Sequence, residues 1–131
     1  MKGKVLTVSP DAGVHRTVAD TLTPHGYVVS CAFSGAEALD RAEAEHPDIL
    51  VLADRLPDMS GFQMMQARRR RADVEREAVV FLVSAAEDKT FQPGFGFFHG
   101  PLDSVLRMPL DPEYLLAYVK RITGLLERHS P

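Results

Sequence analysis

The chain has 131 residues, 45% hydrophobic and 25% charged, a balance that predicts one globular domain over residues 1–131 and not a disordered chain. The net charge of −3 argues against a general nucleic-acid binder, which is usually basic, and no apolar run approaches the about 18 residues of a membrane span. The single cysteine excludes an internal disulfide bond and suits a reducing compartment, so we expect a cytoplasmic protein.

Strand patterns and helix patterns alternate along the chain. In chain order we expect a strand at 5–8, a helix at 11–25, a strand at 27–32, a helix at 34–46, a strand at 49–52, a helix from 61 to about 73, strands at 79–83 and 103–107, and a helix that begins at 111. The strand at 49–52 is apolar throughout, as a strand covered on both faces is. This alternation predicts a doubly wound α/β fold, in which a five-stranded parallel sheet carries helices on both faces.

The segment from Asp48 to Gly61 says most about function. Its apolar strand ends at Ala53 and passes through a turn at Pro57 to Gly61, where a helix pattern begins. This segment resembles the strand–loop–helix of response-regulator receiver domains, in which the strand ends in a phospho-accepting Asp that is followed by three residues and Pro. Counting back from Pro57, the acceptor position is occupied by Ala53, and a methyl group cannot take a phosphoryl group.

The resemblance covers nearly the whole chain, from Lys4 to about Arg128. Further segments match in order and spacing: Gly26-Tyr27-Val28, Ser34-Gly35-Ala36-Glu37-Ala38-Leu39, His46-Pro47-Asp48, Ser84-Ala85 and Met108-Pro109. The match implies the flavodoxin-like receiver fold and a role in two-component or phosphorelay signalling. The implied partner is another protein of the pathway or a second copy of this chain, and neither nucleic acid nor membrane is expected.

Receiver chemistry needs a carboxylate nucleophile, an acidic pair that holds Mg²⁺, a Lys and a hydroxyl near the phosphoryl group, and an aromatic switch residue, because phosphoryl transfer depends on positioning and charge neutralisation. The matching positions hold Ser9 and Pro10 for the acidic pair, Ala53 for the nucleophile, Met108 for the Lys and Val105 for the aromatic residue. The hydroxyl position is retained as Ser84. The resemblance therefore implies a pseudo-receiver, with no catalytic residue, no cofactor and no enzymatic activity.

The sequence leaves two alternative functions open, a phosphorylated regulator and a small-ligand-binding module. Asp54 follows Ala53 directly and would be the acceptor of a functional phosphorelay regulator, although successive strand residues point to opposite faces. Asp11 and Asp54 together would form a weak Mg²⁺ site, since hard cations take carboxylate oxygens. The second alternative is a module that binds a small ligand at the carboxyl edge of the sheet, the usual ligand site of open α/β sheets.

An aromatic segment stands where receivers usually have their fourth helix. Four phenylalanines lie among glycine and proline residues, at Phe91, Phe95, Phe97 and Phe98. Glycine and proline at this density oppose a regular helix, so we expect a degenerate or missing fourth helix. The rings are expected either to pack on the core or to form an exposed face that binds a partner.

Two groups of basic side chains carry no predicted site. The five histidines, at 15, 25, 46, 99 and 129, show no metal-ligand spacing and are expected at the surface or at helix caps. The run of four arginines at 68–71 is expected to be a solvated helix end, in which the Arg68 stem lies along apolar surface and its charged head reaches water.

Overall fold

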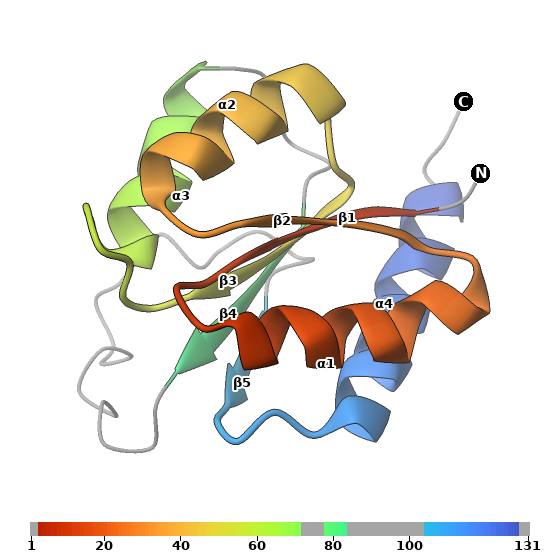
Figure 1. Ribbon diagram of the computed structural model, residues 1–131. Coiled ribbons are helices and arrows are strands. Elements are labelled where there is room, and N and C mark those ends of the chain that lie inside the picture. Colours follow the sequence, from red (N-terminus) through yellow and green to blue (C-terminus); the bar gives the residue numbers. More distant parts are fainter. Residues whose placement is uncertain (1–2, 72–77, 84–103, 129–131) are drawn as a thin grey trace.

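Five β-branched or apolar segments form one parallel sheet in the computed structural model, which describes residues 3–71, 78–83 and 104–128 (Figure 1). The strands are β1 (Lys4–Val8), β2 (Val28–Ala32), β3 (Ile49–Ala53), β4 (Ala78–Val83) and β5 (Ser104–Arg107). Their order across the sheet is β2-β1-β3-β4-β5, and every pairing is parallel. The predicted doubly wound α/β fold is confirmed, with β3 at the centre.

Helices cover both faces of the sheet (Figure 1). They are α1 (Ala12–Leu22), α2 (Gly35–Glu45), α3 (Gly61–Arg71) and α4 (Pro112–Arg128), and a short 3-10 helix, η1 (Thr23–His25), follows α1. The core is accordingly divided into two apolar clusters. One lies between the sheet and α1 with α4, and the other lies between the sheet and α2 with α3.

Alternation along β3 assigns its side chains to these two clusters. Ile49 and Val51 belong to the cluster under α1 and α4, whereas Leu50 and Leu52 belong to the cluster under α2 and α3. All four are fully buried, as expected of a central strand that is covered on both faces. By the same alternation, the next residue, Ala53, belongs on the α1/α4 side of the sheet.

Local sequence signals set the ends of the helices. The predicted helix at 11–25 is an α-helix only as far as Leu22 and then tightens into η1, because Pro24 has no N–H to continue the α-helical pattern. Gly26 ends this segment with a φ of 90°, in the left-handed region that glycine reaches without strain. His46 ends α2 with a φ of 50°, so its expected role as a cap residue is confirmed.

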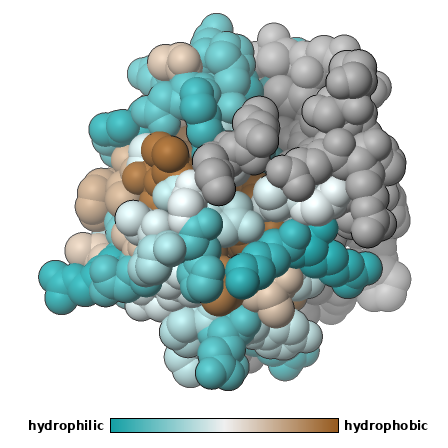
Figure 2. Space-filling model, turned by 90° about the vertical axis from the view of Figure 1, so that its right-hand side faces the viewer, coloured by the Kyte–Doolittle hydropathy of each residue, from teal (hydrophilic) through white to brown (hydrophobic). Residues whose placement is uncertain are grey.

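Several predictions fall on residues that the structure does not describe. Ser84, the four phenylalanines of the aromatic segment and the expected degenerate fourth helix all lie in 84–103, outside the described ranges. In the part of the chain that is described, no helix has the length and apolar character that a bilayer crossing requires. Figure 2 shows a face on which hydrophilic side chains surround small apolar areas, as on most globular proteins.

Candidate functional site at the carboxyl edge of the sheet

Three sequence-predicted positions follow or end strands at the carboxyl edge of the sheet. Ser9 follows β1, Ala53 ends β3, and Met108 follows β5. The register pairs Val8 with Leu52, so the next residues of the two strands, Ser9 and Ala53, lie at the same edge. Ser9 is buried, whereas Ala53 and Met108 are half-buried. Met108 packs against the apolar cluster under α1 and α4. The side chains at the three positions are therefore a hydroxyl (Ser9), a methyl group (Ala53) and a thioether (Met108), and none of them carries a charge.

Ser9 and Asp11 make hydrogen bonds within the turn after β1. The backbone N–H of Asp11 donates to the Ser9 hydroxyl oxygen over 3.0 Å. The Asp11 carboxylate in turn accepts from the N–H of Gly13 over 2.8 Å and caps the N-terminus of α1. A side chain that caps a helix in this way satisfies an N–H group that has no partner within the helix. Asp11 thus has a structural role at the start of α1.

Asp54 continues the ladder between β3 and β4. Its N–H donates to the carbonyl of Leu82 over 3.0 Å, one residue beyond the pairing of Ala53 with Leu82. Its own carbonyl accepts from the N–H of Gly61 over 2.9 Å. The bond to Leu82 extends the pairing of β3 with β4 by one residue, and the backbone bends at Asp54. Alternation from Ala53 favours a different direction for the Asp54 side chain. Its Oδ2 atom is buried and has no hydrogen-bond partner among the described residues.

The donor set at this edge does not fit a divalent cation. Hard cations of the Mg²⁺ type take several oxygen ligands, usually including carboxylates. Here the Asp11 carboxylate caps α1, and the described ranges contain no group of three or more His, Cys, Asp or Glu residues that could hold a metal ion.

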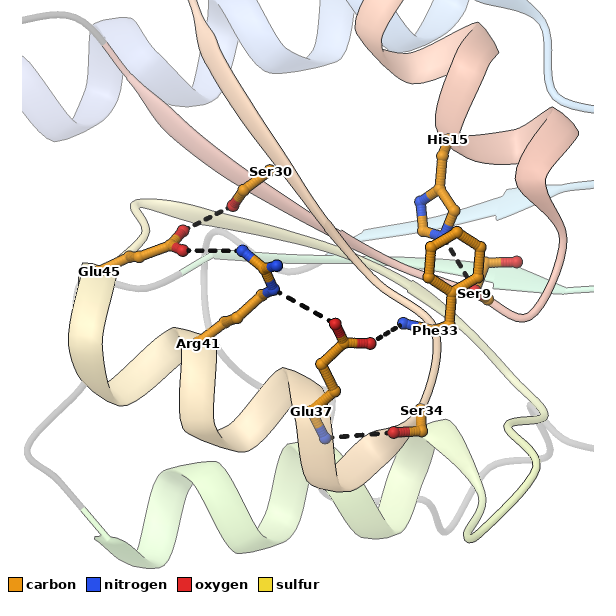
Figure 3. Close-up of polar contacts among 8 residues, drawn as sticks. All are labelled: Ser9, His15, Ser30, Phe33, Ser34, Glu37, Arg41 and Glu45. Atoms are coloured by element: carbon orange, nitrogen blue, oxygen red, sulfur yellow. Dashed lines mark hydrogen bonds and ion pairs between the residues drawn. The ribbon is translucent and has the colours of Figure 1, made fainter.

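His15 is buried, so the expectation that every histidine lies at the surface or at a cap is wrong for this residue. It is 5% exposed, and its Nε2 atom lies 2.9 Å from the carbonyl oxygen of Ser9 (Figure 3). Because a carbonyl can only accept, Nε2 carries the hydrogen. The His15 ring also meets the ring of Phe33 edge-on, with centroids 4.5 Å apart. His15 lies one helical turn before Val18 and two before Leu22, on the buried face of α1, and this spacing is the signal that would have identified it.

A polar network joins the first turn of α2 to the edge strand β2 (Figure 3). Glu37 accepts from the N–H of Phe33 over 2.7 Å and pairs with Arg41, which also pairs with Glu45. Glu45 accepts from the hydroxyl of Ser30 over 2.6 Å. Each charged side chain in the network thus has a partner of opposite charge or a hydrogen-bond donor, and the pairs four residues apart stabilise α2.

The one cysteine lies on β2 near this network. Burial raises the pKa of the Cys31 thiol above its usual 9.0, the positive charge of Arg41 opposes that effect, and the negative charge of Glu37 adds to it. A thiol with a raised pKa is protonated at neutral pH, and the thiolate is the reactive form. Cys31 is therefore not an activated nucleophile.

The loop between β3 and α3 reaches across to α2 through Asp58, a contact that sequence patterns did not reveal. One Asp58 oxygen accepts from the N–H of Gly35 over 2.8 Å, and the other accepts from the N–H of Ala36 over 2.9 Å. The N–H of Gly35, followed by that of Ala36, lowers the pKa of the Asp58 carboxyl below its usual 3.8. Both bonds are made to the charged form of the carboxylate, which is why the shift is downward.

This shift predicts an acid-dependent contribution of Asp58 to stability. The pKa is lower in the folded than in the unfolded chain, so the contribution is fully present above the unfolded value of about 3.9 and is lost as the pH falls through the folded value. We expect the difference in urea midpoint between wild type and Asp58→Asn to be constant from neutral pH down to about pH 5 and to shrink below about pH 4. A difference that grows on acidification would contradict the assignment of these two hydrogen bonds to the carboxylate.

The comparisons with known proteins agree with this architecture. The family model for the response regulator receiver domain matches residues 5–120. Response regulator MprA of Mycobacterium bovis (strain BCG / Pasteur 1173P2) is 32% identical over 131 residues, which is 100% of this chain and 54% of that protein. The alkaline phosphatase synthesis transcriptional regulatory protein PhoP of Bacillus subtilis (strain 168) is 30% identical over 131 residues, 100% of this chain and 52% of that protein.

Solved structures show the same fold. The chemotaxis response regulator CheY4 of Vibrio cholerae superposes with a TM-score of 0.79 at 27% sequence identity, covering 93% of this chain and 99% of that one. The chain spans about half the length of the curated relatives it matches.

Proposed function

Since this chain belongs to the response regulator receiver domain family, we propose that it is a pseudo-receiver, which acts by binding a protein partner in a signalling pathway and is not switched by aspartyl phosphorylation. The observation that carries the proposal is the methyl side chain of Ala53 at the carboxyl end of the central strand β3. The family resemblance matches this position to the phospho-accepting Asp. The proposal assigns no catalytic step and no cofactor to the chain, and it places the protein in the cytoplasm.

The other positions at the carboxyl edge support the same proposal. Ser9 and Pro10 offer no carboxylate where the resemblance expects an acidic pair, and the Ser9 hydroxyl already accepts a hydrogen bond from the turn. Met108 packs into apolar surroundings where the resemblance expects a Lys. Replacing this acid and this base together leaves neither of the two as a charge that has lost its counter-charge. The changes are thus mutually consistent, as expected when the phosphoryl chemistry has been lost as a whole.

This proposal has a consequence for signalling. A ligand shifts a two-state equilibrium only by its difference in affinity for the two states. Without an acceptor, a phosphoryl group supplies no such difference, and the resemblance places Val105, not an aromatic residue, at the switch position. The protein therefore presents one surface that does not depend on phosphorylation, or changes its surface when a partner binds.

The described geometry argues against Asp54 as a replacement acceptor. The hydrogen bond from Asp54 to Leu82 extends the pairing of β3 with β4 by one residue, whereas moving a side chain by one register position requires a bulge. Alternation from Ala53 accordingly favours a different direction for the Asp54 carboxylate than for the Ala53 side chain. Phosphoryl transfer to it would lack the positioning that this chemistry requires.

Exposed apolar residues on β5 and α4 support a protein partner. Val105 is 39% exposed and Tyr114 is 61% exposed, and the two lie on β5 and in the first turn of α4. Tyrosine is enriched in the buried centres of protein interfaces because it contributes a large apolar area and a polar hydroxyl. The prediction that Phe91, Phe95, Phe97 and Phe98 bind a partner concerns residues outside the described ranges.

Incubation with a small phosphodonor and Mg²⁺ tests the proposal. We expect the intact mass of the wild-type protein to stay unchanged, because a methyl group occupies the acceptor position. A phosphorylatable receiver, assayed in parallel, shows that the donor is active. A phosphate-sized gain in the wild type would contradict the proposal.

The Asp54→Asn variant identifies the acceptor if such a gain occurs. A gain that this variant abolishes would assign phosphorylation to Asp54 and establish a functional phosphorelay regulator. The matched variant Asp58→Asn removes an aspartate of the neighbouring loop and is expected to leave the result of the assay unchanged.

A further inference from the structure

The contact between Asp58 and α2 has a role that neither family membership nor the proposed function assigns. Asp58 lies in the loop 54–60, and its two carboxylate oxygens accept from the consecutive N–H groups of Gly35 and Ala36. We infer that Asp58 is a clamp that makes this loop and the N-terminus of α2 one rigid unit at the carboxyl edge of the sheet.

The clamp completes the hydrogen bonding at the start of α2. The first N–H groups of a helix have no partner within the helix. A variant of the capping box serves one N–H of α2 and one N–H before it, since the Ser34 hydroxyl accepts from Glu37 and the Glu37 carboxylate accepts from Phe33, the residue before the N-cap. The N–H groups of Gly35 and Ala36 are out of reach of that box and donate to the loop carboxylate instead. The N-terminus of α2 therefore depends on a residue 22 or 23 positions further along the chain.

Packing reinforces the clamp at the same point. Gly35 is buried, and a Cβ atom placed on it would lie 2.5 Å from both Cγ and Sδ of Met59. Asp58 thus accepts a hydrogen bond from the N–H of Gly35, and the side chain of Met59 occupies the space where a side chain on residue 35 would begin. Gly35 is buried and Asp58 is exposed, so the carboxylate reaches the Gly35 N–H from the solvent side, and losing it would leave a part-buried donor in need of another partner.

Backbone hydrogen bonds within the loop 54–60 connect Asp58 to the rest of the loop, so we expect the loss of the Asp58 contact to loosen these bonds as well. The N–H of Leu56 donates to the carbonyl of Met59 over 3.0 Å, and the N–H of Gly61 donates to the carbonyl of Asp54 over 2.9 Å. These bonds close the loop into a compact turn between β3 and α3. The carboxylate of Asp58 therefore joins a loop that is closed by its own backbone hydrogen bonds to the first turn of α2.

Amide hydrogen exchange of the Asp58→Ala variant, followed residue by residue by NMR, tests the clamp. We expect exchange to become roughly tenfold faster at Gly35 and Ala36, a factor typical of losing a helix cap. The clamp predicts a similar acceleration at Leu56, whose N–H bond lies within the loop and does not involve the Asp58 side chain. Exchange at Leu56 that stays at the wild-type rate would overturn the inference, because Asp58 would then be a cap of α2 alone.

The Ser34→Ala variant is the matched control. It removes the other side-chain cap of α2, so exchange at Glu37 is expected to accelerate while exchange at Leu56 stays unchanged. If Asp58→Ala fails to fold, Asp58→Asn retains the shape of the side chain and one acceptor oxygen, and it is expected to accelerate exchange at Gly35, Ala36 and Leu56 by a smaller factor. Wild-type rates at all three residues in Asp58→Asn would also overturn the inference.

Discussion

Replacing Gly61 with alanine is expected to lower the free energy of unfolding by about 3 kcal/mol, the upper range for forcing extra volume into a packed site. A Cβ atom on Gly61 would overlap the carbonyl oxygen of Ala53 and would lie 3.0 Å from its carbonyl carbon. These atoms belong to the backbone of β3 and cannot rotate away, so the start of α3 must move away from the end of the central strand. Urea denaturation measures the effect.

Gly124→Ala is the matched control for this prediction. Gly124 lies within α4, and a Cβ atom placed there would meet nothing within 4 Å. Alanine is preferred over glycine within helices by about 0.5–1 kcal/mol, so this variant is expected to be slightly more stable than the wild type. The two glycine substitutions should thus have opposite signs. A Gly61→Ala variant as stable as Gly124→Ala would contradict the close approach of α3 to β3.

Replacing Phe81 with alanine is expected to lower the free energy of unfolding by about 3–5 kcal/mol. Phe81 is fully buried in the cluster between the sheet and α2 with α3, and its removal leaves a cavity in addition to the lost apolar burial. Domains of this size are stable by about 5–15 kcal/mol. The variant should therefore unfold at a much lower urea concentration and be partly unfolded at physiological temperature.

Phe33→Ala is the control that separates burial from residue type. Phe33 is 46% exposed and makes its ring contact with His15 at the end of β2. Because water already covers much of this ring, we expect a loss of about 1 kcal/mol, near the centre of the usual range for point mutants. Equal losses for Phe33→Ala and Phe81→Ala would show that the apolar cluster under α2 and α3 is wrongly placed.

The sequence by itself determined the arrangement of the elements. Strand and helix patterns are local, and they predicted five parallel strands, the helix start at Ser34 and the helix end near His46. The position of Ala53 could also be predicted, because the resemblance to receiver domains, counted back from Pro57, implies that it ends the central strand. A break in a motif of this kind is readable without coordinates, since it depends on residue identity and spacing alone.

Only the tertiary structure decided the role of several polar side chains. Arg68 was expected to extend its head into water, yet the whole residue is 2% exposed. It lies one helical turn after Met64 on the buried face of α3, and the packing of that face against its neighbours decides how much of the side chain is covered. His15 was likewise expected at the surface or at a cap, and its burial depends on the Ser9 carbonyl and the Phe33 ring that close over it.

The clamp at Asp58 shows why local features could be predicted from the sequence and long-range contacts could not. Elements form from periodic patterns within about ten to fifteen residues, so neighbouring residues are enough to predict them. The bonds from Gly35 and Ala36 to Asp58 join residues that are 23 and 22 positions apart, and they exist only because the fold brings the end of β3 beside the start of α2. In isolation, Asp58 is an ordinary turn aspartate next to a proline, and the N–H groups that it satisfies belong to an element that sequence spacing cannot place next to it.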